Sequence, residues 1–194
     1  MSDASDTVIY VGDLLTFPSG PGSGVPGVRK LGPSVSAGAR FGLRRGTSAT
    51  SWYDTGCRLE TSDPVGARAA YERALAGCPG LADAHNNLGR LHHDTGATAV
   101  AEACYRLAIC ADPRIALYWF NLGVAVEDQG RRAEAIAAYE RAIELDDRVA
   151  DAHFNLARLL ELTGRRTGDD AMLRCAVRHL LRYRQLAKRS ASAH

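Results

Sequence analysis

The chain has 194 residues, of which 46 % are hydrophobic, and its formal net charge is +2. A chain of this size can bury one continuous hydrophobic core but not a second large domain. It contains no apolar run of transmembrane length, so a soluble protein without membrane contacts is expected.

The first 48 residues show no repeat and are predicted to be a low-complexity, mostly disordered segment. They begin with Met1-Ser-Asp-Ala-Ser-Asp6, which is acidic and argues against a secretory signal, so a cytoplasmic location is expected. An apolar patch at 8–17 could fold against the rest of the chain or against a partner. Residues 18–27 are Pro, Gly, Ser and Val, a run that holds no regular element, and no phosphate-binding glycine motif is present.

Beyond this segment, the sequence repeats with a period of 34 residues. The string ADAHNNLGRL at Ala82 returns as ADAHFNLARL at Ala150, 68 positions later, and the related ALYWFNLG begins halfway between them, at Ala116. A second string, AYERA, begins at Ala70 and again at Ala138, also 68 positions later. Two segments that share one period exclude a compositional accident, and a 34-residue period is typical of a solenoid of helix pairs.

The period divides residues 49–189 into four predicted repeats of two helices, at 49–81, 82–115, 116–149 and 150–189, followed by a tail at 190–194. Positions 4, 7, 8 and 11 of each first helix share one face, as a helix that buries a single stripe requires. Position 4 holds Trp or His in every repeat, and position 8 holds Gly or Ala. These small residues, with Ala at positions 20 and 27, allow close helix packing, and Tyr71, Tyr105 and Tyr139 supply buried area.

Helix ends are predicted from recurring residues. Gly96, Gly130 and Gly164 recur every 34 residues, where a left-handed residue would end the first helix. In repeat one, Asp63-Pro64 is typical of an N-cap carboxylate followed by proline at the first helical position. Repeat four has about seven additional residues at 165–171, which predict an enlarged loop.

This alternation of small and large positions resembles the tetratricopeptide repeat (TPR) family over about three quarters of the chain. The resemblance implies an all-α fold, a TPR-type α-solenoid of about four helix-turn-helix repeats. It also implies a non-catalytic protein–protein interaction module, an adaptor or scaffold of bacterial type. Such a module binds a peptide segment or a partner subunit in its concave groove.

In related solenoids, positions 2, 5, 6, 9 and 12 of the first helix point into that groove. The predicted partner-binding residues at these positions are Asn87, Asn121, Asn155, Arg90, Arg158, Phe120 and Phe154. A carboxamide can donate to and accept from an extended peptide backbone, and guanidinium groups suit a carboxylate. The alternative is that each Asn belongs to the repeat pattern and bonds to a neighbouring helix. The Lys- and Asn-based carboxylate clamp of some TPR proteins is not met, because the first helices of these repeats contain no Lys.

Neither a catalytic nor a metal site is predicted. The spacing of His85, His92 and His93 could suit a metal, but His85 occupies packing position 4 and no Cys or carboxylate completes a ligand set. No GxSxG, HExxH or Cys-His signature is present, so the chain is predicted to be a non-enzyme without a cofactor. The five cysteines include no CxxC pair and are expected to be reduced thiols that pack as small hydrophobes.

The positive charge is concentrated at the C-terminal end. From Arg165 onward, eight Arg and Lys oppose two Asp, a balance of +6, so the preceding residues balance at −4. Arg174, Arg178 and Arg182 form a stripe at i, i+4 and i+8, opposite an apolar face that would cap the solenoid. The stripe is either a solvated terminal face or a surface for an acidic protein or nucleic acid. Few aromatic residues accompany it, which weakens the nucleic-acid interpretation.

The alternative function is an accessory subunit of a nucleic-acid-associated or transcriptional regulator that acts through the basic C-terminal helix. Residues 52–64 resemble repeats found behind a MerR-like DNA-binding domain in some bacterial proteins. No helix-turn-helix precedes them in this sequence, so DNA binding does not follow from the resemblance.

Overall fold

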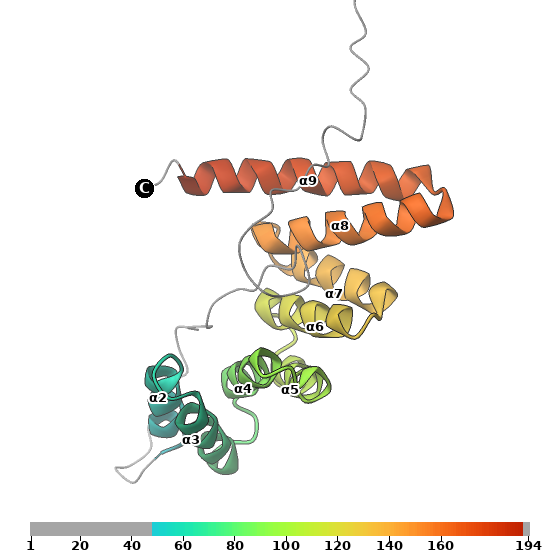
Figure 1. Ribbon diagram of the computed structural model, residues 1–194. Helices are drawn as coiled ribbons and strands as arrows, with labels where there is room; N and C mark the ends of the chain where they lie inside the picture. Colours follow the sequence, from blue (N-terminus) through green and yellow to red (C-terminus); the bar gives the residue numbers. More distant parts are fainter. Residues whose placement is uncertain (1–47, 192–194) are drawn as a thin grey trace, which may run out of the picture. The chain divides into compact units, whose positions relative to one another are not determined.

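The computed structural model describes residues 48–191, which form eight α-helices and no strand (Figure 1). The helices are α2 (Ala49–Leu59), α3 (Pro64–Gly77), α4 (Ala82–Asp94), α5 (Thr98–Ala111), α6 (Ala116–Asp128), α7 (Arg132–Leu145), α8 (Ala150–Thr167) and α9 (Asp170–Ala191). The described residues belong to two compact units, 48–152 and 153–191, and the division lies inside α8. The predicted all-α fold is confirmed. The disorder predicted for residues 1–48 concerns a segment that, apart from its last residue, lies outside the described range.

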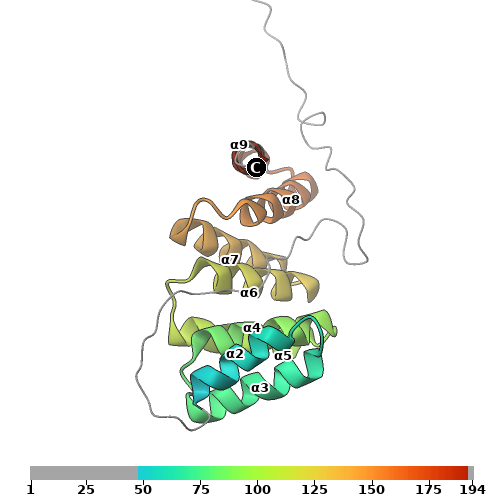
Figure 2. The ribbon, with the colours of Figure 1, turned by 90° about the vertical axis from the view of Figure 1, so that its left-hand side faces the viewer.

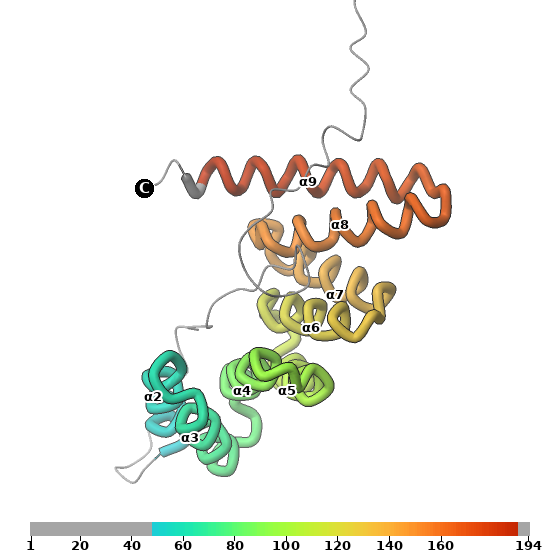
Figure 3. The backbone as a smooth tube through the Cα atoms, in the orientation of Figure 1, coloured from blue at the N-terminus to red at the C-terminus, as the bar shows by residue number. Residues whose placement is uncertain are grey.

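In the unit of residues 48–152, three helix pairs follow one another: α2 with α3, α4 with α5, and α6 with α7. Each second helix also packs against the first helix of the next pair, α3 against α4 and α5 against α6, and α4 touches α6. Figures 2 and 3 show how the chain winds through these pairs. The alanines predicted to allow close packing are all fully buried: Ala67, Ala74, Ala101, Ala108, Ala135 and Ala142.

The glycine at position 8 is explained by a tyrosine ring that recurs in the second helix of the same pair. A Cβ atom at Gly89 would lie 2.8 Å from the Cε1 atom of Tyr105, and a Cβ atom at Gly123 would lie 2.6 Å from that of Tyr139. Both tyrosines are almost fully buried, at 2 % and 0 % exposure. The backbone of the first helix therefore lies directly on the ring, and a larger residue at position 8 would displace it.

Two of the three predicted glycine breaks are confirmed. Gly96 and Gly130 follow α4 and α6 with φ values of +80° and +77°. The third prediction is wrong, because Gly164 lies inside α8 and the left-handed residue is Gly168, at +71°. A Cβ atom on Gly164 would lie 3.1 Å from the side chain of Leu173, so this glycine allows the start of α9 to approach α8. The additional residues of repeat four lengthen α8 and do not form the expected enlarged loop.

The start of α3 agrees with the prediction from Asp63-Pro64. The Asp63 carboxylate accepts a hydrogen bond of 2.9 Å from the backbone N–H of Gly66, and Pro64 occupies the first helical position. The cap satisfies one of the backbone donors that the first turn of a helix leaves without a partner.

The aromatic or histidine residue at position 4 makes a second recurring contact. Trp119 donates from Nε1 to the carbonyl oxygen of Pro113 at 2.9 Å, and Nε2 of His85 lies 2.8 Å from the carbonyl oxygen of Pro79. Each bond joins the first helix of a pair to the proline that closes the preceding repeat. His85 therefore has a structural role, and within residues 48–191 no group of three His, Cys, Asp or Glu residues could hold a metal.

The cysteine prediction holds only in part. All five cysteines are free thiols, but only Cys104 is buried, and Cys78 and Cys110 are exposed. Burial raises the pKa of the Cys104 thiol, which keeps it a neutral packing group. Within the described part of the chain, no helix is long and apolar enough to cross a membrane.

In the unit of residues 153–191, α9 packs against α8 through a small core of Ala157 and Leu180 with Tyr183 beside them. The rings of Phe154 and Tyr183 lie 5.1 Å apart, between centroids. Next to them, the Nδ1 atoms of His153 and His179 lie 2.9 Å apart, so one nitrogen carries the proton and the other accepts it.

Candidate partner-binding face

The asparagines at position 6 are buried within the repeats. Asn87 and Asn155 are 0 % exposed and Asn121 is 6 % exposed. Asn87 donates from Nδ2 to the hydroxyl oxygens of Tyr53, at 3.4 Å, and Tyr71, at 3.3 Å. These distances and burial values show that the amides point into the protein interior. The sequence analysis had instead placed them on an open groove.

The same geometry recurs one repeat later. Asn121 donates from Nδ2 to Oδ1 of Asn86 at 2.9 Å. In both cases an amide at position 6 contacts the residue at position 5 of the preceding repeat, Tyr53 for Asn87 and Asn86 for Asn121. For these two asparagines, the structure therefore shows the alternative reading, a bond to a neighbouring helix. Their bonds join α2 to α4 and α4 to α6.

Arg90, at position 9, is engaged by carboxylates of the chain itself. Its guanidinium forms an ion pair with Glu60 of the preceding repeat and a second one with Asp94, 3.7 Å away on the same helix. The Arg90 side chain is only 18 % exposed. Arg90 is therefore already paired with two carboxylates of the chain itself, which the sequence analysis did not anticipate.

Arg158, at position 9 of the fourth repeat, is partly buried, and burial lowers the pKa of its guanidinium. The two phenylalanines at position 5 also lie in the interior. Phe120 is 0 % exposed, with its ring 5.8 Å from that of Tyr139, and Phe154 is 5 % exposed, with its ring against Tyr183. The expectation of aromatic rings on an open surface is wrong at both positions, because tyrosines of the second helices cover them.

The sequence reasoning missed the carboxylates at the ends of the first helices. Glu60 and Glu127 occupy position 12, and Asp94 and Asp128 occupy position 13. The side chain of Asp94 is 48 % exposed and that of Asp128 is 20 % exposed, whereas Glu60 is 7 % exposed. Reading positions 12 and 13 across the repeats would have revealed this row.

Buried hydroxyl groups hold several carboxylates in place. Tyr71 donates to Glu60 at 2.5 Å and Tyr139 donates to Glu127 at 2.9 Å, so the same contact recurs in the first and third repeats. In the second repeat, position 12 is His93, whose Nε2 lies 2.8 Å from Oδ2 of Asp128 in the next repeat. Burial, followed by hydrogen bonds to Cys57 and Glu60, raises the pKa of Tyr71 far above its ordinary value. The hydroxyl of Tyr71 therefore remains protonated and acts as the donor to Glu60.

A carboxylate at the opposite end of α4, Asp83, is also held by a tyrosine hydroxyl. The hydroxyl of Tyr118, in α6, donates to Oδ1 of Asp83 at 2.6 Å. Burial and this contact raise the pKa of Tyr118. In α2, α4 and α6 together, five Asp and Glu oppose two Arg. The helices that the sequence had assigned to a carboxylate-binding groove are therefore acidic.

A separate polar network connects the second and third repeats. The carboxylate of Glu102, in α5, accepts from Arg131 at 2.6 Å and from Gln129 at 2.9 Å, both between α6 and α7. Arg106 pairs with Glu102 at 2.9 Å and reaches Glu134 of α7 at 3.4 Å. Although burial opposes ionisation, the hydrogen bonds from these donors lower the pKa of Glu102. The network joins α5 to α7 and to the connection between α6 and α7.

The comparisons with known proteins agree with the helix-pair geometry. Family models of the tetratricopeptide repeat match residues 58–116 and 116–148. No curated protein is significantly similar in sequence to this chain. Among solved structures, the crystal structure of MamA is 18 % identical, covers 74 % of this chain and 81 % of its own, and has a TM-score of 0.65.

Two further structures share the fold. The first TPR of Spaghetti (RPAP3), bound to the HSP90 peptide SRMEEVD, is 19 % identical over 61 % of this chain and 94 % of its own, with a TM-score of 0.58. A mutant O-GlcNAc transferase of Thermobaculum terrenum is 25 % identical over 62 % of this chain and 24 % of its own, with a TM-score of 0.57. With the two matched segments and the recurring glycine, tyrosine and alanine contacts, the chain belongs to the tetratricopeptide repeat family.

Proposed function

We propose that this protein is a non-catalytic adaptor or scaffold that holds a peptide segment or a partner subunit along α2, α4 and α6. Proteins of the tetratricopeptide repeat family support this assignment, as does the structure of the first TPR of Spaghetti (RPAP3) with an HSP90 peptide. The observation that carries the proposal is the row of carboxylates at positions 12 and 13. The row is acidic, partly exposed and held by buried hydroxyl groups.

The chemistry of this row favours a partner segment that contains Lys or Arg. The HSP90 peptide SRMEEVD carries three acidic residues and suits a cationic site. In this chain, Arg90 is already paired with Glu60 and Asp94, and no Lys occurs in the first helices. A cationic segment would find exposed carboxylate oxygens, whereas an acidic one would be repelled.

The seven residues predicted from the sequence enter this proposal in a supporting role. Asn87 and Asn121 join the first helices, and Arg90 orients the carboxylates of Glu60 and Asp94. Phe120 packs against Tyr139, whose hydroxyl donates to Glu127. Asn155, Arg158 and Phe154 are the counterparts at the same positions of the fourth repeat. Because a peptide loses ordering entropy on binding, several such positions have to act together.

The test measures binding of a fluorescent peptide that alternates Lys and Ala, with a Glu-for-Lys peptide as the opposite-charge probe. The variant Asp94→Asn with Asp128→Asn removes the two charges of the row at position 13, which are 48 % and 20 % exposed. Glu140→Gln removes an exposed charge of α7 and serves as the control. We expect the Lys peptide alone to bind, and binding to weaken in the double variant but not in the control. Equal binding by the double variant and the parent, with folding verified by circular dichroism, would refute the proposal.

A further inference from the structure

The outer side of α9 differs in residue type from the outer sides of the other second helices, α3, α5 and α7. Ala176 and Leu180 are buried at 0 % and 4 % exposure, at the positions that Ala135 and Tyr139 occupy in α7. This alignment sets Leu181 against charged residues of the other second helices, which are Glu72, Arg106 and Glu140. Leu181 is nevertheless 45 % exposed. An apolar side chain therefore stands where the repeat otherwise has a charge.

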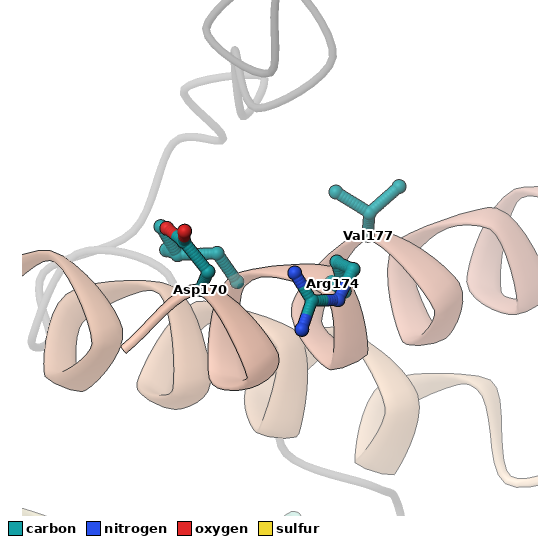
Figure 4. A pocket seen from close by; sticks show the side chains of 4 residues that line it. Asp170, Arg174 and Val177 are labelled. Carbon is teal, nitrogen blue, oxygen red and sulfur yellow. The ribbon is translucent and has the colours of Figure 1, made fainter. Parts of the chain in front are cut away.

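Two residues extend this apolar position into a stripe. Leu173 and Val177 precede Leu181 by eight and four residues, so the three share one side of α9. Both are partly buried and line a pocket together with Asp170 and Arg174, on the side of α9 drawn in Figure 4. Stacking against α8 uses Ala176 and Leu180, and Leu173 also lies close to Gly164 of α8. Val177 and Leu181 are not part of that core, so they remain available on the outer side of α9.

The residues beside the stripe are basic where the repeat has small side chains. Arg174 and Arg178 are both exposed. The corresponding residues of α3, α5 and α7 are Val65, Ala99 and Ala133 for the first, and Ala69, Ala103 and Ala137 for the second. The packing of a second helix therefore does not require arginine at either position. In addition, α9 has 22 residues, compared with 14 in each of the other second helices.

We propose that this side of α9, consisting of Leu173, Arg174, Val177, Arg178 and Leu181 and here called the α9 face, binds an acidic amphipathic helix of a partner protein. Leucine-type side chains of such a helix would pack on the stripe, as amphipathic helices do in apolar grooves. Its carboxylates would pair with the two arginines, which favour bidentate contacts. The proposal does not depend on the partner of the first helices.

The charge and composition of α9 favour an acidic partner helix over two other possible occupants, a second copy of α9 and nucleic acid. From Asp170 onward, α9 carries six Arg and Lys and one Asp, so a second copy of the helix would bring like charges together. Nucleic acid would satisfy the arginines but leave the apolar stripe without a function. The only aromatic residue of α9, Tyr183, packs against Phe154, which removes it from base stacking.

The test uses the full chain and a synthetic peptide helix with Leu at i, i+3 and i+7 and Glu on both flanks. A matched peptide has Lys in place of each Glu. Leu181→Glu alters the stripe, and Arg174→Glu with Arg178→Glu reverses the basic flank. Leu107→Glu is the control, since Leu107 is 51 % exposed on α5. Anisotropy titrations give the affinities, and circular dichroism verifies folding.

We expect the Glu peptide to bind and the Lys peptide not to bind. Leu181→Glu and the double Arg variant should each weaken binding about tenfold or more, the scale of burying one leucine side chain, and Leu107→Glu should leave it unchanged. Three results would overturn the proposal. They are no binding of the Glu peptide, equal loss with Leu107→Glu, or binding of duplex DNA that the double Arg variant abolishes and Leu181→Glu does not affect. A fourth contradicting result would be self-association of the chain that Leu181→Glu abolishes, and sedimentation of the chain alone detects it.

Discussion

Because Gly123 lies against the ring of Tyr139, we expect Gly123→Ala to destabilise the protein when the tyrosine is present and to stabilise it when the tyrosine is absent. Alanine at a helical position occupied by glycine ordinarily stabilises a helix by about 1 kcal/mol. Here the new Cβ atom would lie 2.6 Å from Cε1 and 2.7 Å from Cδ1 of Tyr139. The ring has no room to move, because it is fully buried, lies 5.8 Å from Phe120 and donates its hydroxyl to Glu127.

The expected magnitude follows from two opposing terms. Overpacking of a filled core costs about 1–3 kcal/mol, which exceeds the gain in helix propensity of about 1 kcal/mol. We therefore expect Gly123→Ala to lower the free energy of unfolding by up to about 2 kcal/mol. Tyr139→Ala alone should cost about 3–5 kcal/mol, as other aromatic truncations in cores do. In that background the ring is absent, so Gly123→Ala should stabilise by about 0.5–1 kcal/mol.

A double-mutant cycle measured by urea unfolding, with circular dichroism as the signal, determines both signs. If Tyr139→Ala is too unstable to fold, Tyr139→Leu takes its place in the cycle. An equal loss of stability from Gly123→Ala in both backgrounds would refute the close contact. An unchanged melting temperature in Tyr139→Ala would refute the repeat frame itself.

Three further substitutions test other contacts. Asp63→Ala should lower the free energy of unfolding by about 1 kcal/mol through loss of the N-cap of α3, and Asp63→Asn should retain most of it; urea unfolding compares the two. Asn87→Ala should cost about 1–3 kcal/mol, because it removes the buried donor shared by Tyr53 and Tyr71; the same measurement applies, and a neutral result would contradict the amide link between repeats. Burial, with His153 and Arg178 nearby, lowers the pKa of His179 to about 4. An unfolded histidine titrates near about 6.5, so the stability that neutral His179 contributes is complete above that pH and is lost toward about pH 4, by at most about 1.4 kcal/mol per pH unit. Unfolding between about pH 5 and 7 should therefore depend more steeply on pH in the parent than in His179→Gln.

The 34-residue period predicted the fold because residues at the same position of successive repeats have the same structural role. Gly96 and Gly130 end their helices as expected, since each stands two residues after the last residue of a first helix. Gly164 occupies the same position in the frame but lies inside α8, because helix-compatible residues follow it and Gly168 provides the left-handed conformation. A period therefore predicts where a break is needed only while the connection keeps its length.

The candidate site was harder to predict, because sharing a face does not reveal what covers that face. Asn87 was assigned to a groove from its position in α4, but its partners Tyr53 and Tyr71 are 34 and 16 residues away in the sequence. Arg90 is neutralised by Glu60 of the preceding repeat, a contact that depends on how two pairs stack. Such contacts arise from the packing angle between repeats, which composition and spacing leave undetermined.

Stacking also explains why the two proposed surfaces have opposite charge. Asn87, Asn121 and Arg90, at positions 6 and 9, contact the preceding repeat, so the proposed recognition surfaces are positions 12 and 13 of the first helices and the outer side of α9. The former are acidic and favour a Lys- or Arg-containing segment; the latter is basic with an apolar stripe and favours an acidic helix. Each probe is therefore a control for the other surface. Asp94→Asn with Asp128→Asn should affect only the cationic peptide, and Leu181→Glu only the acidic one. If either variant weakened both peptides, a general loss of structure would explain the result better than two separate surfaces.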